Sequence, residues 1–357
     1  MVSKEFEQME TKDGLHMREL LTASRMSTLL ACPRRHFWRY ELGLKAETEA
    51  HALRFGSAWH AAMEARWQGL AFESALEAAV TGMQFEELQI ATFSGLLAGY
   101  FRRYAEDMVK ELHAEVEFRH PIEGSRTFDS AGKIDGLGVL HDGRLALVEH
   151  KTTSESVDSG SDYWLRLRLN QQVMQYVVAA RALGWDVRMI LYDVTKKPAI
   201  APLSAVPVLD EQGRKIVVDG TGERVIKKDG TPRETGDKEK GFVLQARPET
   251  AEEFGERLAA DTQERPEFYF ARREVPVLDQ DLEEFKVQRY ELSKLILALR
   301  QAERRTGLRE QAWPRNVNGM SCQGCEFAGF CLQGVHADGE HLPAGFRVGP
   351  AHGELGG

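Results

Sequence analysis

The order of predicted elements along the chain indicates an α/β fold with a mixed central sheet and flanking helices. Apolar and polar residues alternate over 114–118, 133–140 and 144–151, which is the pattern of half-buried strands. A helical pattern over 170–183 then leads into the apolar run 187–194, as a crossover helix leads into a further buried strand. Helical periodicity dominates on both sides of this region.

The chain before the predicted sheet reads mainly as helices. Helical periodicity begins at Ser24 and is interrupted at Pro33, because a proline ring and its missing amide hydrogen break a helix. Residues 54–67 and 73–104 are two further predicted helices. This part of the chain is therefore expected to form a helix-rich arm beside the sheet.

Residues 196–243 differ in character from their neighbours. Turn sequences containing glycine recur between short alternating runs, which predicts an inserted β-meander with a flexible tip. Helices are predicted again over 250–262 and 281–305. The predicted organisation is a loose N-terminus (1–20), a helical arm (21–112), a core (113–195), an inserted β-meander or flexible loop (196–245), a second helical arm (246–334) and an irregular tail (335–357).

The composition is that of an ordinary soluble protein. Of the 357 residues, 42% are hydrophobic and 28% are charged. The apolar runs are far too short to span a bilayer and no signal segment opens the chain, so a cytoplasmic protein with no membrane partner is expected. The net charge of −9 argues against a coat protein that binds nucleic acid by neutralising phosphates, although an enzyme with a local basic groove remains compatible with it.

The stretch 132–153 carries the residues with the clearest chemistry. Its HDG tripeptide fits a three-residue hairpin loop, and this loop places Asp135 opposite Glu149 on one face of the sheet. Lys151 lies two residues beyond Glu149 and points to the same face, whereas His150 points away. A two-residue loop would instead place Asp135 opposite His150 and separate the set.

Two carboxylates and a lysine at one strand end suit metal-dependent phosphodiester hydrolysis. Carboxylate oxygens bind Mg²⁺ or Mn²⁺, and the bound metal activates water and neutralises charge on the phosphoryl oxygens. The lysine orients the nucleophile or stabilises that charge. A surface hairpin with an ordinary salt bridge is the alternative interpretation of the same residues.

Motifs on either side of the hairpin extend this set. Gly56 and His60 stand four residues apart on one predicted helix, and Gln172 and Tyr176 stand four apart on another. With its G-x-x-x-H, Asp, E-x-K and Q-x-x-x-Y motifs in this order, the chain resembles the PD-(D/E)XK nuclease superfamily. The resemblance is to the branch with RecB- and AddB-type nuclease domains and the CRISPR-associated iron–sulfur exonucleases, and it spans about 24–332.

The resemblance implies a restriction-endonuclease-like core and a role for each residue of the hairpin set. By that resemblance, His60, Asp135 and Glu149 would be metal ligands. The backbone carbonyl of His150 would complete the metal site, and Lys151 would be the catalytic lysine.

Gln172 and Tyr176 would, by the same resemblance, contact DNA or order the catalytic site. These residues also have plainer interpretations, as a polar edge and a core aromatic. His60 has one too, as a partly buried histidine hydrogen-bonded to Glu64. The chain departs from the family pattern at Ile134, which stands where the family often has proline.

A glutamate on the strand before the hairpin often supports the site in this family. Glu115 and Glu117 both lie on that strand. Their spacing does not decide between them, and an exposed edge-strand carboxylate is the plainer role for at least one.

The chain has four cysteines, Cys32 and the compact triplet Cys322, Cys325 and Cys331. Such a triplet with one remote partner suits a [4Fe–4S] cluster held by four thiolates, and tetrahedral Zn²⁺ is the chemical alternative. The resemblance extends to this set in AddB-type and CRISPR-associated relatives. An iron–sulfur cluster here would join the N- and C-terminal helical arms over the nuclease core.

The segment RRHFWRY, residues 34–40, interleaves arginines with aromatic residues, as single-strand binders do. We expect Phe37 and Tyr40 to pack around the cluster, and Arg34 or Arg35 to contact DNA. A second segment, RPEFYFARREV, resembles part of the C-terminal arm of phage-like relatives and carries no predicted role.

Together with the resemblance, these features imply a stand-alone, metal-dependent DNA nuclease. It would be an exonuclease on single-stranded or frayed ends, in recombination, repair or replication of a prokaryote or its phage. The chain has no phosphate-binding Walker motif, so a helicase, polymerase or recombinase would be a separate partner. Two alternatives stay open, a structure-selective endonuclease and a catalytically weak iron–sulfur adaptor that binds DNA ends.

Overall fold

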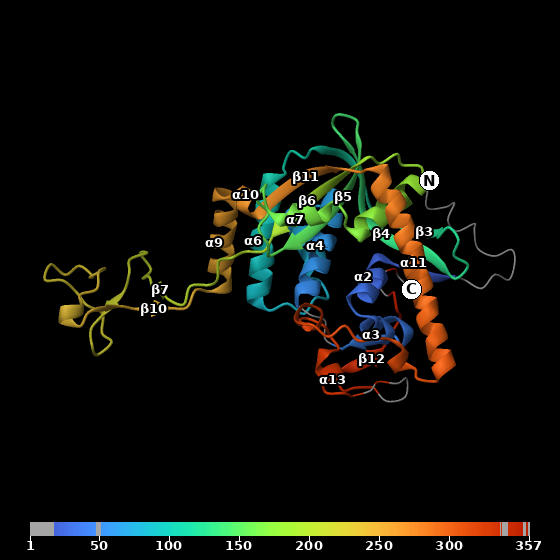
Figure 1. Ribbon diagram of the computed structural model, residues 1–357. Helices are drawn as coiled ribbons and strands as arrows, with labels where there is room; N and C mark the ends of the chain where they lie inside the picture. Colours follow the sequence, from blue (N-terminus) through green and yellow to red (C-terminus); the bar gives the residue numbers. More distant parts are fainter. Residues whose placement is uncertain (1–17, 48–50, 336, 338–341, 353–354, 356–357) are drawn as a thin grey trace.

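A mixed sheet of six strands forms the centre of the computed structural model, which describes residues 18–47, 51–335, 337, 342–352 and 355 (Figure 1). Strands β1, β4, β5, β6 and β11 follow one another across the sheet, and β3 pairs with β4. In the order β1, β3, β4, β5, β6 and β11, the bounds are Glu19–Leu21, Val109–Pro121, Phe128–Leu140, Leu145–Thr153, Met189–Lys196 and Phe270–Pro276. The β1–β4 and β5–β6 pairs are parallel and the other pairs antiparallel. The predicted mixed central sheet is therefore present.

The hairpin between β4 and β5 has the predicted three-residue loop. The amide of Leu140 donates to the carbonyl of Arg144 at 2.9 Å, and Gly143 takes the left-handed conformation with φ 85°. Gly136 consequently pairs with Val148, so the predicted register is confirmed.

Strand β4 changes neighbours along one edge, and this change opens the sheet. Its residues 136–139 pair with β5, whereas its residues 128–130 pair with β1. Among the described residues, 131–135 have no ladder partner on this edge. Asp135 therefore lies where β5 parts from β4.

Helices cover both faces of the sheet (Figure 1). Their bounds are His51–Trp67 (α4), Glu87–Arg103 (α6), Asp162–Leu167 (α7), Gln171–Ala182 (α8), Ala251–Glu264 (α9) and Asp279–Thr306 (α11). Glu149 and Lys151 lie on the face covered by α7 and α8, whereas His150 faces α4 and α6. Helix α11 packs on α8, and α9 packs on α6. No helix in the described ranges is long and apolar enough to cross a membrane.

Segments from the two ends of the chain pack together into one arm, the cysteine arm, beside the sheet (Figure 1). It comprises α2 (Ala23–Ala31), α3 (Pro33–His36), the π-helical turn η2 (Phe37–Glu41), β2 (Leu44–Ala46), η4 (Glu310–Ala312), α12 (Gly319–Cys322), α13 (Ala328–Leu332) and β12 (Phe346–Val348). Strands β2 and β12 pair antiparallel, and the buried Trp38 ring lies 5.4 Å from that of Phe327 and 4.7 Å from that of Phe330.

The single helix predicted over 73–104 is two helices in the structure. Helix α5 (Phe72–Val80) ends before Gly82, whose φ is 75°. Glu86 and Gln89 then form a capping box that starts α6. The apolar pattern continues through this turn, so it did not indicate where the first helix ends and the second begins.

Strands occur in the described residues at four places where none was predicted, one of which is β2. The segment 265–275 forms α10 (Pro266–Tyr269) and most of β11. Strand β12 lies in the tail predicted to be irregular, and β1 overlaps the N-terminus predicted to be loose, of which residues 1–17 lie outside the described residues. Three-residue strands are too short to show alternation, which explains β1 and β12.

The insert between β6 and α9 projects away from the sheet (Figure 1). It contains β7 (Val206–Pro207), β8 (Val217–Val218), η3 (Lys238–Lys240), β9 (Val243–Leu244) and β10 (Ala246–Arg247). The two-residue strands pair antiparallel, β7 with β10 and β8 with β9. The insert contributes no strand to the central sheet.

Candidate active site

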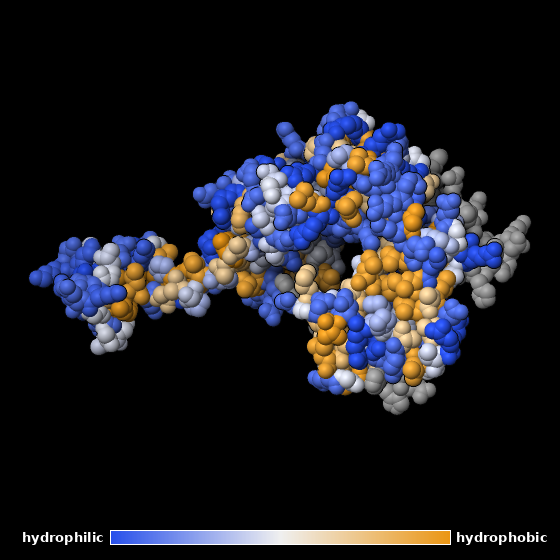
Figure 2. Space-filling model, viewed as in Figure 1, coloured by the Kyte–Doolittle hydropathy of each residue, from blue (hydrophilic) through white to orange (hydrophobic). Residues whose placement is uncertain are grey.

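A cleft of about 840 Å³ opens where β5 and β1 leave β4. Its walls come from α2, α4, β3, β4 and the start of α8. The space-filling view in Figure 2 shows the surface hollowed between α4 and α2. The functional side chains in its lining are His60, Glu64, Glu115, Lys133, Asp135, Gln172 and Tyr176. The G-x-x-x-H, Asp and Q-x-x-x-Y motifs, distant in the sequence, thus meet in one cavity.

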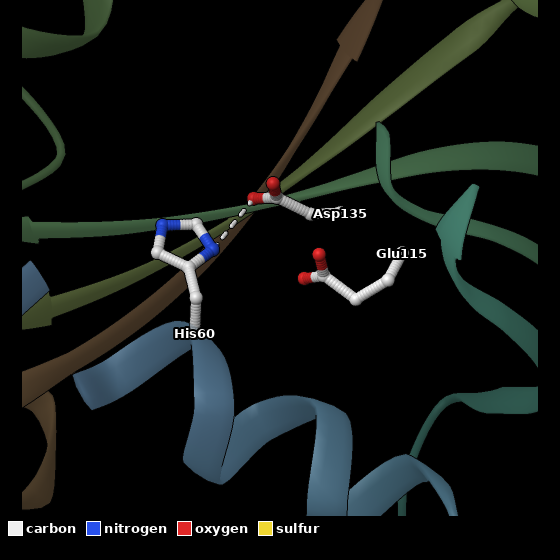
Figure 3. A group of neighbouring side chains, drawn as sticks. All are labelled: His60, Glu115 and Asp135. Carbon is white, nitrogen blue, oxygen red and sulfur yellow. Dashed lines mark ion pairs between the residues drawn. The ribbon is translucent and has the colours of Figure 1, made fainter. Parts of the chain in front are cut away.

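Three potential metal ligands converge in this cleft (Figure 3). His60 on α4, Glu115 on β3 and Asp135 on β4 each offer a ligand atom, and these atoms lie within 4.8 Å of one another. The Nδ1 atom of His60 is 3.5 Å from Oδ2 of Asp135. Glu64, the partner considered for His60 from the sequence, instead accepts a hydrogen bond from Gln68.

The structure separates the two glutamates that the sequence left unresolved. Glu115 faces the cleft, whereas Glu117 is exposed and pairs across the strands with Lys133. Glu115 has φ 54°, which is strained for a residue with a side chain, and it forms no ladder pair with Asp135 opposite it. The Oε2 atom of Glu115 forms an ion pair with Lys133, so β3 brings a third carboxylate to the site.

A chain of side chains runs from Glu149 along the α8 side of the site. The Glu149 carboxylate is wholly buried, and its Oε1 forms an ion pair with Lys151. Its Oε2 accepts no hydrogen bond from the residues described. Lys151 donates to Oε1 of Gln172 at 2.7 Å, and the Gln172 amide donates to the hydroxyl of Tyr176 at 2.9 Å. Gln172 therefore fixes the position of the lysine ammonium group.

Asp135 and Glu149 share a buried environment that opposes their ionisation. Burial raises the pKa of Asp135 to about 6. Burial and the neighbouring charge of Asp135 raise the pKa of Glu149 to about 7. The same surroundings lower the pKa of His60 to about 4, mainly through burial, so His60 is neutral at pH 7.

The residues present fit a divalent cation. The donor set of carboxylate oxygens and one neutral imidazole suits Mg²⁺ or Mn²⁺. A divalent cation would give the undonated Oε2 of Glu149 a partner and would favour the ionised forms of Asp135 and Glu149, whose pKa values burial raises.

The four cysteines line one small cavity in the cysteine arm, although Cys32 and the triplet lie near opposite ends of the chain. All four are partly buried, and burial raises the pKa of Cys325 and of Cys331. The amide of Asn316 lies 3.4 Å from the Cys32 sulfur as a hydrogen-bond donor. Backbone donors to sulfur are a feature of iron–sulfur sites.

The prediction that Arg34 contacts DNA is not supported by its position. Arg34 is buried, donates to Oε1 of Glu310 at 2.6 Å and donates to the carbonyl of Trp313 at 2.9 Å. The charged guanidinium group of Arg34 therefore links α3 to the segment around η4. Arg35 is partly exposed and forms an ion pair with Glu326 at 2.6 Å, so it alone of the two has solvent access.

Phe37 and Tyr40 pack within the cysteine arm, but neither lines the cavity of the four cysteines, where the aromatic residue is Trp38. The buried ring of Phe37 lies 5.7 Å from that of Trp313, and Tyr40 lies 5.2 Å from the ring of His36. The sequence interpretation did not identify Lys133 as a site residue. Strand alternation could have found it, because Lys133 lies two residues before Asp135 on β4 and therefore on the same face.

Comparison with known proteins gives one strong match. A model of the PD-(D/E)XK nuclease superfamily matches residues 20–332. No curated protein matches. Among solved structures, one titled "Crystal structure of SSO0001" is similar at 12% identity and a TM-score of 0.25, over 73% of this chain and 81% of that one. A second, protein VC1899 from Vibrio cholerae, is 12% identical with a TM-score of 0.17, over 51% of this chain and 50% of its own. Both TM-scores are too low to bear on fold or function.

Proposed function

The chain belongs to the PD-(D/E)XK nuclease superfamily, whose members are nucleases that use divalent metals, and we propose that it is an Mg²⁺- or Mn²⁺-dependent deoxyribonuclease. One observation carries this proposal. His60, Glu115 and Asp135 converge in the cleft at the point where the sheet opens, and the Glu149–Lys151 pair lies on the neighbouring strand, outside the lining of the cleft. A structural salt bridge does not explain why two buried carboxyl groups with raised pKa values lie on adjacent strands, one of them in the lining of a large cleft.

Each residue has a defined task in the proposed reaction. His60, Asp135, Glu149 and the backbone carbonyl of His150 would hold the metal, with Glu115 as a further carboxylate at its edge. The metal would lower the pKa of a water molecule and neutralise charge on the scissile phosphate. Lys151, held by Gln172, would stabilise the negative charge that develops on the phosphoryl oxygens.

We assign Gln172 and Tyr176 to ordering this site and to contact with DNA. Their side chains line the cleft and form a continuous hydrogen-bonded chain with Lys151. Arg35 is retained as a DNA contact because it is partly exposed.

The preferred substrate is single-stranded or frayed DNA, and the preferred mode is exonucleolytic. The cleft lies in the hollow between α4 and the cysteine arm (Figure 2). The motif resemblance to the RecB- and AddB-type branch supports the same mode.

We also propose that the four cysteines hold a [4Fe–4S] cluster. Convergence of Cys32 with the triplet on one cavity supports it, as does the backbone amide of Asn316 that faces the Cys32 sulfur. The cluster would fasten the cysteine arm beside the active-site cleft. Anaerobically purified protein should be brown with broad absorbance near roughly 400 nm, and colourless protein containing zinc would contradict the assignment.

The biological setting follows from the same resemblance. We place the protein in the cytoplasm of a prokaryote, encoded by the host or by a phage, in recombination, repair or replication. A helicase, polymerase or recombinase would deliver the DNA ends.

Digestion of labelled DNA tests the proposed function. Single strands labelled at the 5′ or the 3′ end should be shortened from one end with Mg²⁺ or Mn²⁺, and EDTA should abolish the reaction. Covalently closed circular single strands should resist digestion. Cutting of circles would identify the structure-selective endonuclease instead, and tight end binding without any cutting would identify the iron–sulfur adaptor.

A further inference from the structure

Behind the proposed metal site, three titratable side chains form a row across three strands of the sheet. His150 on β5 pairs in register with Asp193 on β6, and Asp193 pairs with Arg272 on β11. Residues that pair in register on neighbouring strands point to the same face of the sheet. The side chains of this row therefore point to the face opposite to that of Glu149 and Lys151. The row therefore lies beneath α4 and α6.

Asp193 is the centre of this row. Its Oδ2 atom lies 3.2 Å from Nδ1 of His150, accepts a hydrogen bond from Arg272 at 3.1 Å and accepts another from the hydroxyl of Tyr100. Asp193 is 1% exposed and His150 is 2% exposed. A buried carboxylate is tolerated when it is paired and hydrogen-bonded in this way.

The far end of the row is anchored by Asp107. Both of its oxygens accept hydrogen bonds from Arg272, at 2.5 and 3.0 Å, and its Oδ2 also accepts one from Arg66 at 3.0 Å. Arg272 thus sits between two carboxylates, and only Asp193 of the two touches His150.

His150 is held from three directions. Its Nδ1 atom faces Asp193, and its Nε2 atom accepts a hydrogen bond from the indole of Trp67 at 3.4 Å. Its backbone amide donates to Oδ2 of Asp135 at 2.9 Å. The imidazole ring therefore has a fixed orientation, and its main chain is bonded directly to a proposed metal ligand.

The need for this support arises from the opening of the sheet. The β4–β5 ladder stops at the pair Gly136 and Val148, so residues 149–151 have a strand neighbour on one side only, which is β6. These are the residues whose position decides the geometry of the proposed site. Side-chain contacts from His150 take the place of the missing ladder.

We propose that Asp193 is a positioning residue, which holds His150 and thereby fixes Glu149, Lys151 and the His150 carbonyl at the metal site. Arg272 acts through Asp193 by orienting its carboxylate. This inference rests on the proposed function, since it concerns the same site. It also gives a role to the ARREV part of the segment 265–275.

Binding of Mn²⁺ to the full-length protein with its cysteine site loaded tests this inference. The Asp193→Asn variant keeps the size of the side chain and removes its charge. We expect Mn²⁺ affinity, measured by electron paramagnetic resonance in the absence of DNA, to fall 10- to 100-fold, which is typical for residues that orient metal ligands. We expect kcat to fall with it, while KM for DNA stays within about twofold.

The matched control is Asp107→Asn, which alters the same buried arginine but does not touch His150. It should leave Mn²⁺ affinity within about twofold of that of the unaltered chain. His150→Ala keeps the backbone carbonyl and should reproduce the loss seen in Asp193→Asn. Combining the two substitutions should add little further loss, because they remove one interaction.

Tyr100→Phe removes one donor to Asp193 without altering charge, and it should weaken Mn²⁺ binding about two- to fivefold even if Asp193→Asn does not fold. The inference would be overturned if Asp193→Asn and Tyr100→Phe both left the Mn²⁺ affinity unchanged. It would also be overturned if Asp107→Asn reduced the Mn²⁺ affinity as much as Asp193→Asn does. Failure of the proposed function gives a different result, in which the unaltered chain binds Mn²⁺ and leaves DNA intact.

Discussion

The active-site cleft and the cysteine arm both gather ligand-type residues whose ionised forms are disfavoured by burial, but the contacts that surround the two sets differ. In the cleft, burial raises the pKa values of Asp135 and Glu149, so their ionised forms are unfavourable until a cation is present. In the cysteine arm, the cysteines are surrounded by contacts that are favourable by themselves. The arginine–glutamate pair of Arg34 and Glu310 and the Trp38–Phe327 contact are examples.

We therefore assign the cleft to catalysis and the cysteine arm to stabilising the fold. Substitutions in the cleft should reduce activity and leave stability equal or improved. Substitutions in the cysteine arm should reduce stability first and activity only as a consequence. Four predictions test this separation, from the largest expected effect to the smallest.

Lys151→Ala should reduce kcat for DNA cleavage by about 10³-fold or more, because the phosphoryl charge loses its ammonium partner. At pH 6, where Glu149 is protonated because its pKa is raised to about 7, the thermal unfolding midpoint should stay within a few degrees of that of the unaltered chain. Activity on labelled single strands and a thermal melt measure the two effects. A large fall in stability with unchanged kcat would reverse the assignment of this region.

Cys32→Ser should remove the absorbance near 400 nm and lower the unfolding midpoint by roughly 5–10 °C, since a group that binds the folded state contributes its binding free energy to folding. Loss of colour and the thermal melt are both recorded on anaerobic protein. An equally stable, equally coloured Cys32→Ser protein would show that Cys32 is not the fourth ligand.

Arg34→Ala should destabilise the protein by about 3 kcal/mol, because it removes a buried ion pair with Glu310 and a hydrogen bond to the carbonyl of Trp313. Affinity for single-stranded DNA, measured on the folded fraction, should be unchanged. Arg35→Ala provides the contrast, since its partly exposed side chain should affect DNA affinity and cost little stability. If Arg34→Ala weakened DNA binding and Arg35→Ala did not, the two roles would have to be exchanged.

Glu149→Gln should stabilise the metal-free protein by about 1–3 kcal/mol at pH 8. The pKa of Glu149 is raised from 4.5 to about 7, so between these pH values the folded chain keeps a proton that the unfolded chain has lost. The free energy of unfolding therefore falls as pH rises through this range, and the fall is complete above pH 7.

Urea denaturation of metal-free protein at pH 5 and pH 8 checks this sign. The gain from Glu149→Gln should be large at pH 8 and small at pH 5. A gain of the same size at both pH values would show that the carboxylate is not held in its unfavourable form.

Local patterns were enough to predict the hairpin and the residues on it. The HDG loop sets the register through turn geometry alone, and register then determines which side chains share a face. The same reasoning placed Glu149 and Lys151 on one side and His150 on the other.

Features that depend on the third dimension could not be predicted. The choice between Glu115 and Glu117 depends on a left-handed backbone at Glu115, which no local pattern requires. Arg34 lies in a segment whose composition is typical of strand binding, and only Glu310, far along the chain, makes it a buried structural residue. Arg272 and Asp193 are likewise joined by strand pairing between segments that show no mutual signature.

The most direct test of the central claim compares Asp135→Ala with Glu117→Ala in Mn²⁺-dependent digestion of end-labelled single strands. Both remove a carboxylate from neighbouring strands of one sheet, but only Asp135 faces the cleft. We predict that Asp135→Ala abolishes digestion and that Glu117→Ala digests at a rate within about twofold of that of the unaltered chain. Digestion that continues unchanged in Asp135→Ala would contradict a metal-dependent nuclease at this site.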